Sequence, residues 1–135
     1  MEVRIKINDS IEENEVVELY QANGWSSAEK PKLLLLALEN SHTLVTARID
    51  DKLVGIGNAI SDGYLVVYYP HILVHPAYQS KGIGSKIMQA MQSIYKEFHQ
   101  QMLTADINVI EFYKTVGFEP AVNTQSMWIY EGNDH

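Results

Sequence analysis

The sequence predicts a protein of the α+β class, built from hairpin-linked strands and amphipathic helices. Two observations carry this prediction. Short apolar runs are bounded by Asp, Ser, Asn and Gly clusters, which is typical of strands joined by tight turns, and other segments repeat their apolar residues with the helical period. Along the chain these segments give the order β-α-α-β-β-β-α-β-α-β-β. We expect a single domain over residues 1–135, which would bury about two thirds of the surface that the unfolded chain exposes.

The first part of the chain is predicted to begin with a strand over residues 3–7, where apolar and polar side chains alternate. A helix follows whose apolar residues share one face, and Gly24 ends it. A second helix is predicted to be capped by Ser26 or Ser27, with Pro31 inside its first turn.

Three strands are predicted next, over residues 43–49, 52–60 and 64–74, with turn residues between them. Pro70 removes an N–H donor from the third strand, so we expect an edge or a bulge at that point. The remaining predicted elements are a long helix over 82–98, a strand over 102–105, a short helix that contains Tyr113, and final strands over 118–122 and 126–130.

The junction between the third of these strands and the long helix carries the most informative pattern, Gln79-x-x-Gly82-x-Gly84. Glycines at the start of a helix let backbone N–H groups approach a ligand closely, and the positive helix end favours an anion such as a pyrophosphate. Lys81 adds charge of the right sign. The alternative interpretation is a glycine-rich turn that binds nothing.

A second pattern lies between Asp106 and Phe118. The apolar residues at 109, 112, 113 and 116 share one face of a short helix, which places Tyr113 on that face. Asp106 is the predicted N-cap of this helix, and Gly117 is its predicted C′ residue.

Both patterns resemble signatures of the GCN5-related N-acetyltransferase (GNAT) family. The first resembles the family's loop for acetyl-coenzyme A (acetyl-CoA), which wraps the pyrophosphate of coenzyme A, and the second resembles the family's Tyr-bearing helix. The predicted order of elements is similar to the family's fold along nearly the whole chain. The resemblance implies an α/β/α sandwich with a mixed, mostly antiparallel central sheet of about six to seven strands and about four helices.

The resemblance also implies which residues contact acetyl-CoA, the expected cosubstrate. In the family, backbone groups of the strand before the loop bind the pantetheine amide, and the N–H that faces the thioester carbonyl belongs here to Val74. Tyr113 takes the place of the general acid toward the leaving thiolate. The family's frequent Asn is Asp106 here, with Asn108 two positions off, and the choice between them stays open. The implied cofactor-binding residues are Ile72, Leu73, Val74, Gln79, Ser80, Lys81, Gly82, Ile83, Gly84, Ser85, Asp106, Asn108 and Tyr113.

The general base has a less direct signal. Many family members carry a carboxylate on the strand that leads to the loop, and residues 64–74 contain none. His71 is the titratable group of suitable pKa there, because an unperturbed imidazole near 6.5 suits a base at neutral pH. The alternatives are a structural or pocket-wall role for His71, with a water chain lined by Tyr68 and Tyr69 acting in its place.

Four aromatic residues are candidates for the walls of the acceptor pocket, namely Trp25, Tyr20, Tyr68 and Tyr69. Trp25 lies between the first two predicted helices, a region that in the family often covers this pocket, although a Trp in such a loop is also typical of the core. An aromatic lining favours an amine with an apolar body through cation–π and stacking contacts.

Composition excludes several other kinds of function. Cys is absent, which excludes disulfides, thiolate metal sites and a cysteine nucleophile, so direct transfer in a ternary complex is expected. His71 and His75 would lie about 13 Å apart along a strand, too far to share an ion, and no metal site is predicted. The net charge of −7 opposes nucleic-acid binding. We recognise no membrane-spanning run and no signal peptide, so no membrane contact and a cytoplasmic location are expected.

The sequence therefore predicts an acetyl-CoA-dependent N-acetyltransferase that acts on a primary amine of a small molecule. One alternative is acetylation of a protein or peptide amine, which needs an open groove. Another is a non-catalytic module that binds or senses coenzyme A. A homodimer is compatible with the sequence.

Overall fold

The computed structural model describes residues 2–132. Six strands form one mixed sheet in the order β1-β2-β3-β4-β6, and β5 pairs with β3 beside this path. All of these pairings are antiparallel except that of β4 with β6, which is parallel. The strands are β1 (Arg4–Ile7), β2 (Thr43–Ile49), β3 (Lys52–Ser61), β4 (Val66–Tyr68), β5 (Ile72–Val74) and β6 (Gln100–Met102).

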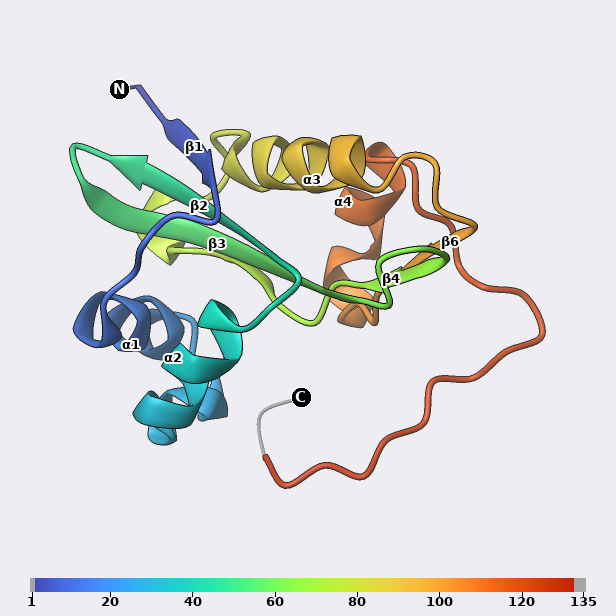
Figure 1. Cartoon of the computed structure of the whole chain (residues 1–135), viewed down its shortest axis with the longest axis horizontal. Helices are drawn as coiled ribbons and strands as arrows, with labels where there is room; N and C mark the ends of the chain where they lie inside the picture. The colour runs from blue at the N-terminus through green and yellow to red at the C-terminus, as the bar shows by residue number, and fades with distance from the viewer. Residues whose placement is uncertain (1, 133–135) are drawn as a thin grey trace.

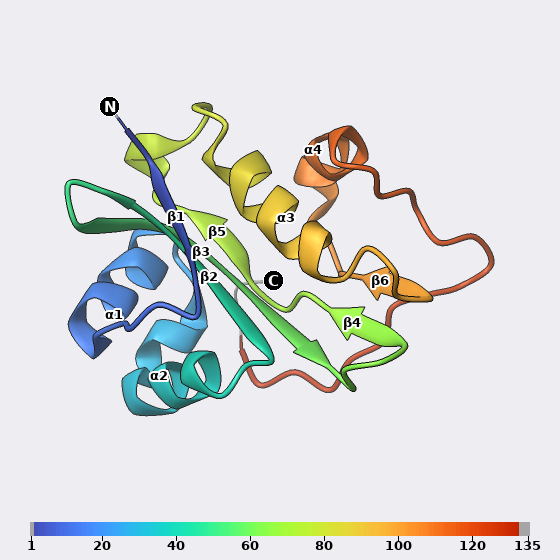
Figure 2. The ribbon, with the colours of Figure 1, turned by 45° about the horizontal axis from the view of Figure 1, so that its top comes forward.

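Helices cover both faces of the sheet, as Figure 1 shows. Helix α3 (Ile83–Ile94) crosses one face, and α1 (Glu13–Ala22) and α2 (Pro31–Glu39) cover part of the other. Helix α4 (Ile110–Thr115) lies alongside α3 (Figure 2), with Phe112 against Gly84 at the start of α3 and the carbonyl of Val116 accepting from Gln92 near its end. Each face of the sheet has its own buried apolar cluster. The arrangement confirms the predicted α/β/α sandwich with a mixed, mostly antiparallel sheet.

Two glycines in β3 set the distance between α3 and the sheet. A Cβ placed on Gly57 would lie 2.7 Å from Cγ2 of Ile87, and one on Gly55 would lie 3.0 Å from Cδ1 of the same side chain. Ile87 is fully buried. Because the backbone of β3 presents no side chain at these two positions, α3 packs directly on the strand.

The single strand predicted over residues 64–74 is wrong, because the chain breaks at Tyr69-Pro70-His71. Strand β4 pairs with the end of β3, whereas β5 pairs with its middle. At the break, the N–H of His71 donates to Oδ1 of Asn58, and the N–H of Asn58 donates to the carbonyl of His71. Pro70 has no N–H to contribute, so the break occurs where ladder pairing is already weakened.

Several predicted boundaries also need correction. The second helix begins at Pro31, which is its first residue, and the segment Ser26–Glu29 forms a separate 3₁₀ helix in place of the predicted serine cap. Helix α3 ends at Ile94 and not near residue 98, and the strand predicted over 102–105 is β6, at Gln100–Met102. No strand forms over 118–122 or 126–130, and residues 119–132 run as an extended loop. Figure 2 shows this segment passing around the outside of the molecule.

Candidate active site

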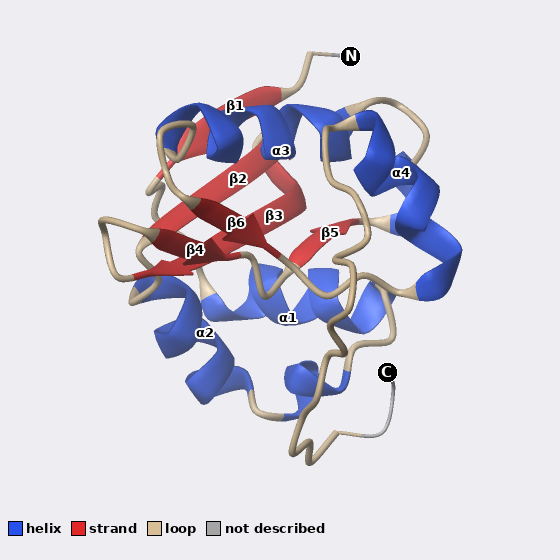
Figure 3. Ribbon diagram, turned by 90° about the vertical axis from the view of Figure 1, so that its right-hand side faces the viewer, coloured by secondary structure: helices blue, strands red, loops and turns tan. Residues whose placement is uncertain are grey.

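A cleft opens where β5 diverges from β4. Figure 3 shows β5 separated from the β4–β6 pair, with α4 beyond it. The cleft has a volume of about 540 Å³ and is bounded by β5, the start of α3, the segment after β6 and α4. Among the residues that line it are these members of the predicted site: Trp25, Tyr69, Ile72, Leu73, Val74, Gln79, Ser80, Gly82, Ile83, Gly84, Ser85, Asp106 and Tyr113.

The backbone of β5 presents alternate residues to β3 and to the cleft. Leu73 lies opposite Ile56 of β3. On either side of this pair, the carbonyl of His71 accepts from the N–H of Asn58, and the N–H of His75 donates to the carbonyl of Val54. In an antiparallel pair, successive residues direct their N–H and C=O groups to opposite sides. The backbone groups of Ile72 and Val74 therefore point away from β3 and toward the cleft, whereas those of Leu73 belong to the sheet.

Gln79 joins the loop to this open edge of β5. Its side-chain Nε2 donates to the carbonyl oxygen of Val74 over 3.0 Å. Because that carbonyl already has a partner, the N–H of Val74 is the group that this residue directs into the cleft. The glutamine of the loop pattern thus has a structural role that spacing alone did not reveal.

The start of α3 presents backbone donors to the same cleft. Gly82 is the N-cap residue with φ of 79°, and Ser80 has φ of 64°, so the loop turns twice through the left-handed region. The first intrahelical bond runs from the N–H of Lys86 to the carbonyl of Gly82. The amides of Ile83, Gly84 and Ser85 precede that bond, which is where a helix has N–H groups without helical acceptors and a positive end.

Gly84 permits close packing between α3 and α4. A Cβ on this residue would lie 3.1 Å from Cζ of Phe112, which also lines the cleft. The glycine therefore makes room for an aromatic ring as well as for a ligand. The sequence placed Phe112 only on the apolar face of its helix. It gave no indication that this face packs against a glycine of another helix.

Tyr113 lies on α4 and is held by the end of that helix. The N–H of Gly117, with φ of 100°, donates to the carbonyl of Lys114, and the N–H of Phe118 donates to that of Tyr113. This is a Schellman motif with Gly117 as the predicted C′ residue, and the rings of Tyr113 and Phe118 are in edge contact. Burial, with a smaller contribution from the Asp106 charge, raises the pKa of Tyr113 to about 12. The hydroxyl is therefore neutral at pH 7 and remains a donor.

The structure distinguishes the positions of Asp106 and Asn108. Asp106 lines the cleft, whereas Asn108 is exposed on the 3₁₀ helix Ile107–Val109 outside the lining. Asp106 is the N-cap residue of that 3₁₀ helix, but its side chain makes no capping hydrogen bond, and α4 itself begins later, at Ile110.

Trp25 and Tyr69, both predicted for the acceptor pocket, line the cleft, and Tyr20 and His71 do not. Tyr20 is fully buried, and its hydroxyl lies 2.8 Å from Nδ1 of His71. Burial raises the pKa of Tyr20, so the hydroxyl stays protonated. The His71 ring is in edge contact with Trp25, with ring centroids 5.2 Å apart, and this places the imidazole behind the indole instead of among the lining residues.

Two further predicted residues lie elsewhere. Tyr68 is on the opposite face of β4 from the buried Val67, and 36% of its surface is exposed outside the cleft. Lys81 is exposed on the loop and does not line the cleft. Residues that sequence reasoning missed include Asn23, Leu103, Thr104 and Ala105, which line the cleft from loops, and Tyr78, which lines it from the 3₁₀ helix Pro76–Tyr78.

Comparison with known proteins identifies the family. The family model of the acetyltransferase (GNAT) domain matches residues 9–128. The uncharacterised N-acetyltransferase ycf52 of Pyropia yezoensis is 28% identical over 124 residues, which cover 87% of this chain and 70% of that protein. The chain belongs to the GNAT family, as its two motifs indicated, and its class of enzyme is N-acetyltransferase.

Solved structures agree with this assignment. A GNAT-family acetyltransferase from Streptococcus pneumoniae TIGR4 superposes with a TM-score of 0.84 and 30% identity, over 96% of this chain and 98% of that one. The aminoglycoside N-acetyltransferase AAC(6')-Iy, solved in complex with CoA, shares the fold with a TM-score of 0.71 at 15% identity, over 96% of this chain and 94% of that one. Within residues 2–132, no helix has the length and apolar character needed to span a membrane.

Proposed function

We propose that this protein transfers the acetyl group of acetyl-CoA directly to a primary amine of a small molecule, and that the cleft beside β5 is where it does so. The observation that carries the proposal is the convergence on one cleft of three kinds of donor. These are the N–H of Val74, the first amides of α3 and the hydroxyl of Tyr113.

The donors at the start of α3 fit the pyrophosphate of coenzyme A. No heavy atom outside its chain neighbours lies within 4 Å of a Cβ built on Gly82, so a phosphate can approach the backbone there. The helix end supplies N–H groups and a positive partial charge. The solved complex of AAC(6')-Iy with CoA supports this choice of ligand for the fold.

The N–H of Val74 is suited to stabilise charge on the thioester oxygen. As an amine nitrogen attacks the carbonyl carbon, negative charge develops on that oxygen, and a fixed N–H in a dry cleft stabilises it more than water does. The carbonyl of Val74 accepts from Gln79, and the backbone of Leu73 pairs with Ile56 of β3, so the strand is fixed on both sides of this N–H before substrate arrives.

Tyr113 acts on the leaving sulfur. The carbon–sulfur bond breaks as the amide forms, the thiolate takes up a proton, and the amine nitrogen loses one to water or to His71. A thiol has a pKa of about 8.5, and that of Tyr113 is about 12. Complete transfer of the phenolic proton to the thiolate is therefore uphill, and Tyr113 acts chiefly by donating a hydrogen bond to the sulfur.

Trp25 and Tyr69 favour an acceptor with an apolar or aromatic body next to its amine. The indole lines the cleft, and the ring of Tyr69 is fixed by the bond from its hydroxyl to Oε1 of Gln101, over 2.7 Å. Flat aromatic walls bind apolar groups and cations by stacking and cation–π contact.

The test is a screen of amines with detection of free thiol. The chain contains no Cys, so a thiol reagent responds only to released coenzyme A. We expect thiol to appear only when enzyme, acetyl-CoA and a suitable amine are present together. Binding of coenzyme A by calorimetry without thiol release from any aliphatic, aromatic or peptide amine would make the protein a binding module. Thiol release with peptide amines alone would indicate that the acceptor is a protein or a peptide and not a small molecule.

A further inference from the structure

Asn58 is a buried polar residue of β3 whose side chain completes the pairing with His71. Only 4% of its surface is exposed. In an antiparallel sheet, the two residues of a hydrogen-bonded pair exchange two main-chain N–H···O=C bonds. Here the N–H of Asn58 donates to the carbonyl of His71 over 3.0 Å, but the N–H of His71 donates to the side-chain Oδ1 of Asn58, also over 3.0 Å. The side chain of Asn58 thus acts in place of a main-chain carbonyl.

The side-chain acceptor is needed because the segment opposite β3 has one extra residue at this point. Between its pairing with β5 and its pairing with β4, β3 has two residues, 58–59, whereas the opposite segment has three, 69–71. Such a bulge leaves the extra residue unpaired and bends the strand. The Oδ1 of Asn58 supplies the acceptor that the His71 N–H would otherwise lack at this point of the ladder.

The other end of the Asn58 amide is fixed as well. Its Nδ2 donates to the hydroxyl of Ser41 over 3.0 Å, and that hydroxyl donates to the carbonyl of Ala37 in α2 over 2.9 Å. Because the Ser41 hydroxyl uses its hydrogen toward Ala37, it accepts from Asn58. This arrangement leaves the amide oxygen of Asn58 facing the N–H of His71.

The side chain of His71 connects this point of the backbone to the wall of the cleft. Its Nδ1 lies 2.8 Å from the Tyr20 hydroxyl, and its ring contacts that of Trp25, with centroids 5.2 Å apart. The carbonyl of Tyr20 in turn accepts from the N–H of Trp25 over 3.1 Å. A shift of the His71 backbone would therefore be passed to the indole that lines the cleft.

The backbone that follows His71 carries the donors on the other side of the cleft. Ile72 comes directly after it, and the main-chain groups of Ile72 and Val74 point away from β3. The ring of His71 thus contacts Trp25, while its main chain leads into β5. Asn58 holds the residue at which these two parts of the cleft meet.

We infer that Asn58 is a positioning residue for acetyl transfer, because it fixes the wall at Trp25 relative to the N–H of Val74. The inference rests on the proposed function, in which Trp25 contacts the amine and Val74 contacts the thioester. Asn58 does not line the cleft, so it acts through His71 and not by touching a substrate. A displacement of about 1 Å between reacting groups can cost roughly 100-fold in rate.

Two variants separate the bond to His71 from the bond to Ser41. Asn58→Leu has a similar size and removes both, whereas Asn58→Asp loses the donor to Ser41 and keeps an oxygen that accepts from His71. We expect Asn58→Leu to lower kcat roughly 10- to 100-fold, and Asn58→Asp to keep it within about threefold of the native value. The dissociation constant for coenzyme A should change by less than about threefold in both, because the start of α3 is unaltered.

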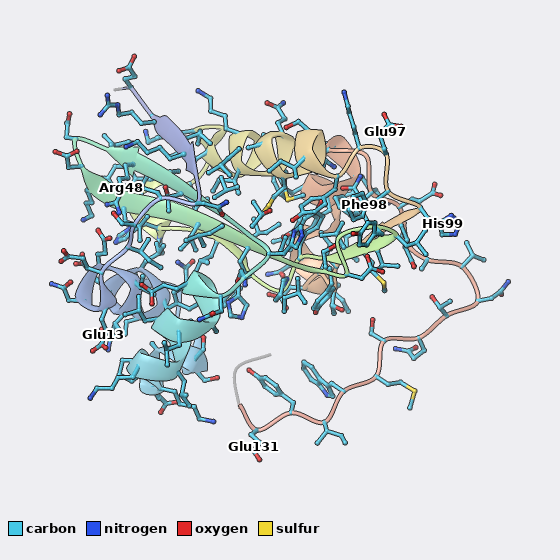
Figure 4. All side chains as sticks on the ribbon, viewed as in Figure 1. Glu13, Arg48, Glu97, Phe98, His99 and Glu131 are labelled. Atoms are coloured by element: carbon cyan, nitrogen blue, oxygen red, sulfur yellow. The ribbon has the colours of Figure 1, made fainter. Side chains whose placement is uncertain are left out.

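The control is Thr46→Val, which removes a different buried hydrogen bond. The Thr46 hydroxyl donates to Asp9 over 3.2 Å, and Asp9 also accepts from Arg48. Figure 4 shows Arg48 toward the end of the sheet opposite His99, and neither Thr46 nor Arg48 lines the cleft. Thr46→Val should reduce thermal stability and leave kcat unchanged, which separates loss of stability from loss of position.

A second readout does not depend on turnover. The chain has two Trp residues, so Trp128→Phe leaves Trp25 as the single indole. In this background, acrylamide should quench the fluorescence of Trp25 at a changed rate in Asn58→Leu and at the native rate in Asn58→Asp. If Asn58→Leu does not fold, Asn58→Ser replaces it with the same expected results, because its hydroxyl is one atom shorter and is withdrawn from the His71 N–H.

Three results would each overturn the proposal: native kcat in the folded Asn58→Leu protein, equal losses of kcat in Asn58→Leu and Asn58→Asp, or quenching of Trp25 that Asn58→Leu leaves unchanged. If the native protein releases thiol with no amine, the proposed function fails instead. The quenching of Trp25 then decides by itself whether Asn58 holds the wall of the cleft.

Discussion

The side-chain amide of Gln79 donates a hydrogen bond of 3.0 Å to the main-chain carbonyl of Val74. The bond connects the loop before α3 to the open edge of β5, so the two sets of backbone donors in the cleft are mechanically coupled. The proposed pyrophosphate site and the proposed oxyanion donor are therefore positioned together.

Replacing Gln79 should weaken coenzyme A binding. Gln79→Ala removes the bond and frees the loop, and we expect the dissociation constant for coenzyme A to rise roughly three- to tenfold by calorimetry. Gln79→Glu should be worse, because its carboxylate would face the carbonyl of Val74 and an anionic ligand. Gln89→Ala, an exposed position on α3, is the control. Equal affinity for coenzyme A in the native protein and all three variants would show that Gln79 does not contribute to the binding site.

The alternation of β5 predicts opposite outcomes for two proline variants. Val74→Pro deletes an N–H directed to the cleft, so the protein should fold while its turnover falls by roughly two to three orders of magnitude. Leu73→Pro deletes an N–H that faces Ile56 of β3, and it should destabilise the sheet. Circular dichroism and thermal unfolding measure folding, and thiol release measures turnover. A folded and fully active Val74→Pro variant would contradict the oxyanion role.

The contact between Gly84 and Phe112 can be tested by a double-mutant cycle. Gly84→Ala places a Cβ 3.1 Å from Cζ of Phe112, so the ring must give way slightly where α3 meets α4. We expect lower activity and reduced stability, and we expect Phe112→Leu to restore part of both in the double variant. Strictly additive losses would show that the two residues are not coupled.

Tyr113→Phe should reduce turnover more than it changes the Michaelis constant for acetyl-CoA. Loss of a hydrogen bond to a charged sulfur corresponds to a roughly 10- to 100-fold lower kcat. Because the pKa of Tyr113 is raised to about 12, its titration should produce no descending limb in the pH profile of the native enzyme below about pH 10. An unchanged kcat, with the chemical step rate-limiting, would leave Tyr113 as a packing residue.

The direction of the hydrogen bond between Tyr20 and His71 decides whether His71 can act as the general base. If Nδ1 of His71 donates to the Tyr20 hydroxyl, the other ring nitrogen can accept a proton, and His71→Gln should cost roughly two to four orders of magnitude in rate. Tyr20→Phe should then shift the ascending limb of the pH profile. If Tyr20 donates to Nδ1 instead, His71→Gln will retain both the rate and the limb, and water or a deprotonated amine takes the proton.

Arg48 connects β2 to α1 through Glu15 and gives stability a defined pH dependence. Its two terminal nitrogens each lie 2.8 Å from a carboxylate oxygen of Glu15. This bond holds the pKa of Glu15 below its ordinary value of 4.5. The stabilisation is thus complete above that value and is lost as the pH falls through the lowered pKa of the folded state.

Glu15→Gln should therefore lower the free energy of unfolding by about 1–3 kcal/mol at pH 7. The difference from the native protein should narrow as the pH falls below 4.5, because the carboxylate of Glu15 becomes protonated first in the unfolded state and then, at the lowered pKa, in the folded state. Glu18→Gln breaks a more exposed ion pair with Lys52, and it should change stability by less than about 0.5 kcal/mol. Urea unfolding at several pH values measures both. A constant difference at all pH values would contradict the assignment to ionised Glu15.

Local patterns predicted the parts of the fold that have local causes. The start of α3 at Gly82 and the end of α4 at Gly117 follow from backbone conformations that favour glycine. The division of residues 64–74 into two strands was not predicted, because the apolar run is continuous and the break depends on which part of β3 each half meets. Pro70 indicated a weak point but not a division.

The candidate site follows the same distinction. The loop and Tyr113 were found because their spacing along the chain is itself the signal. The bond between Tyr20 and His71 joins residues 51 positions apart, and no local pattern indicates it. The last predicted strand, residues 126–130, has the right alternation, but a strand also needs an edge to pair with, and alternation alone does not provide one.

The most direct measurement of the central claim is the simultaneous quantification of free coenzyme A and acetylated amine during turnover, by thiol detection and mass spectrometry, in the native protein and in Val74→Pro. We expect equal amounts of the two products, initial rates that require both substrates in one complex, no acetylated protein, and loss of both products in the variant. Tight binding of coenzyme A with no acetylated amine, or equal product formation by a folded Val74→Pro protein, would contradict it.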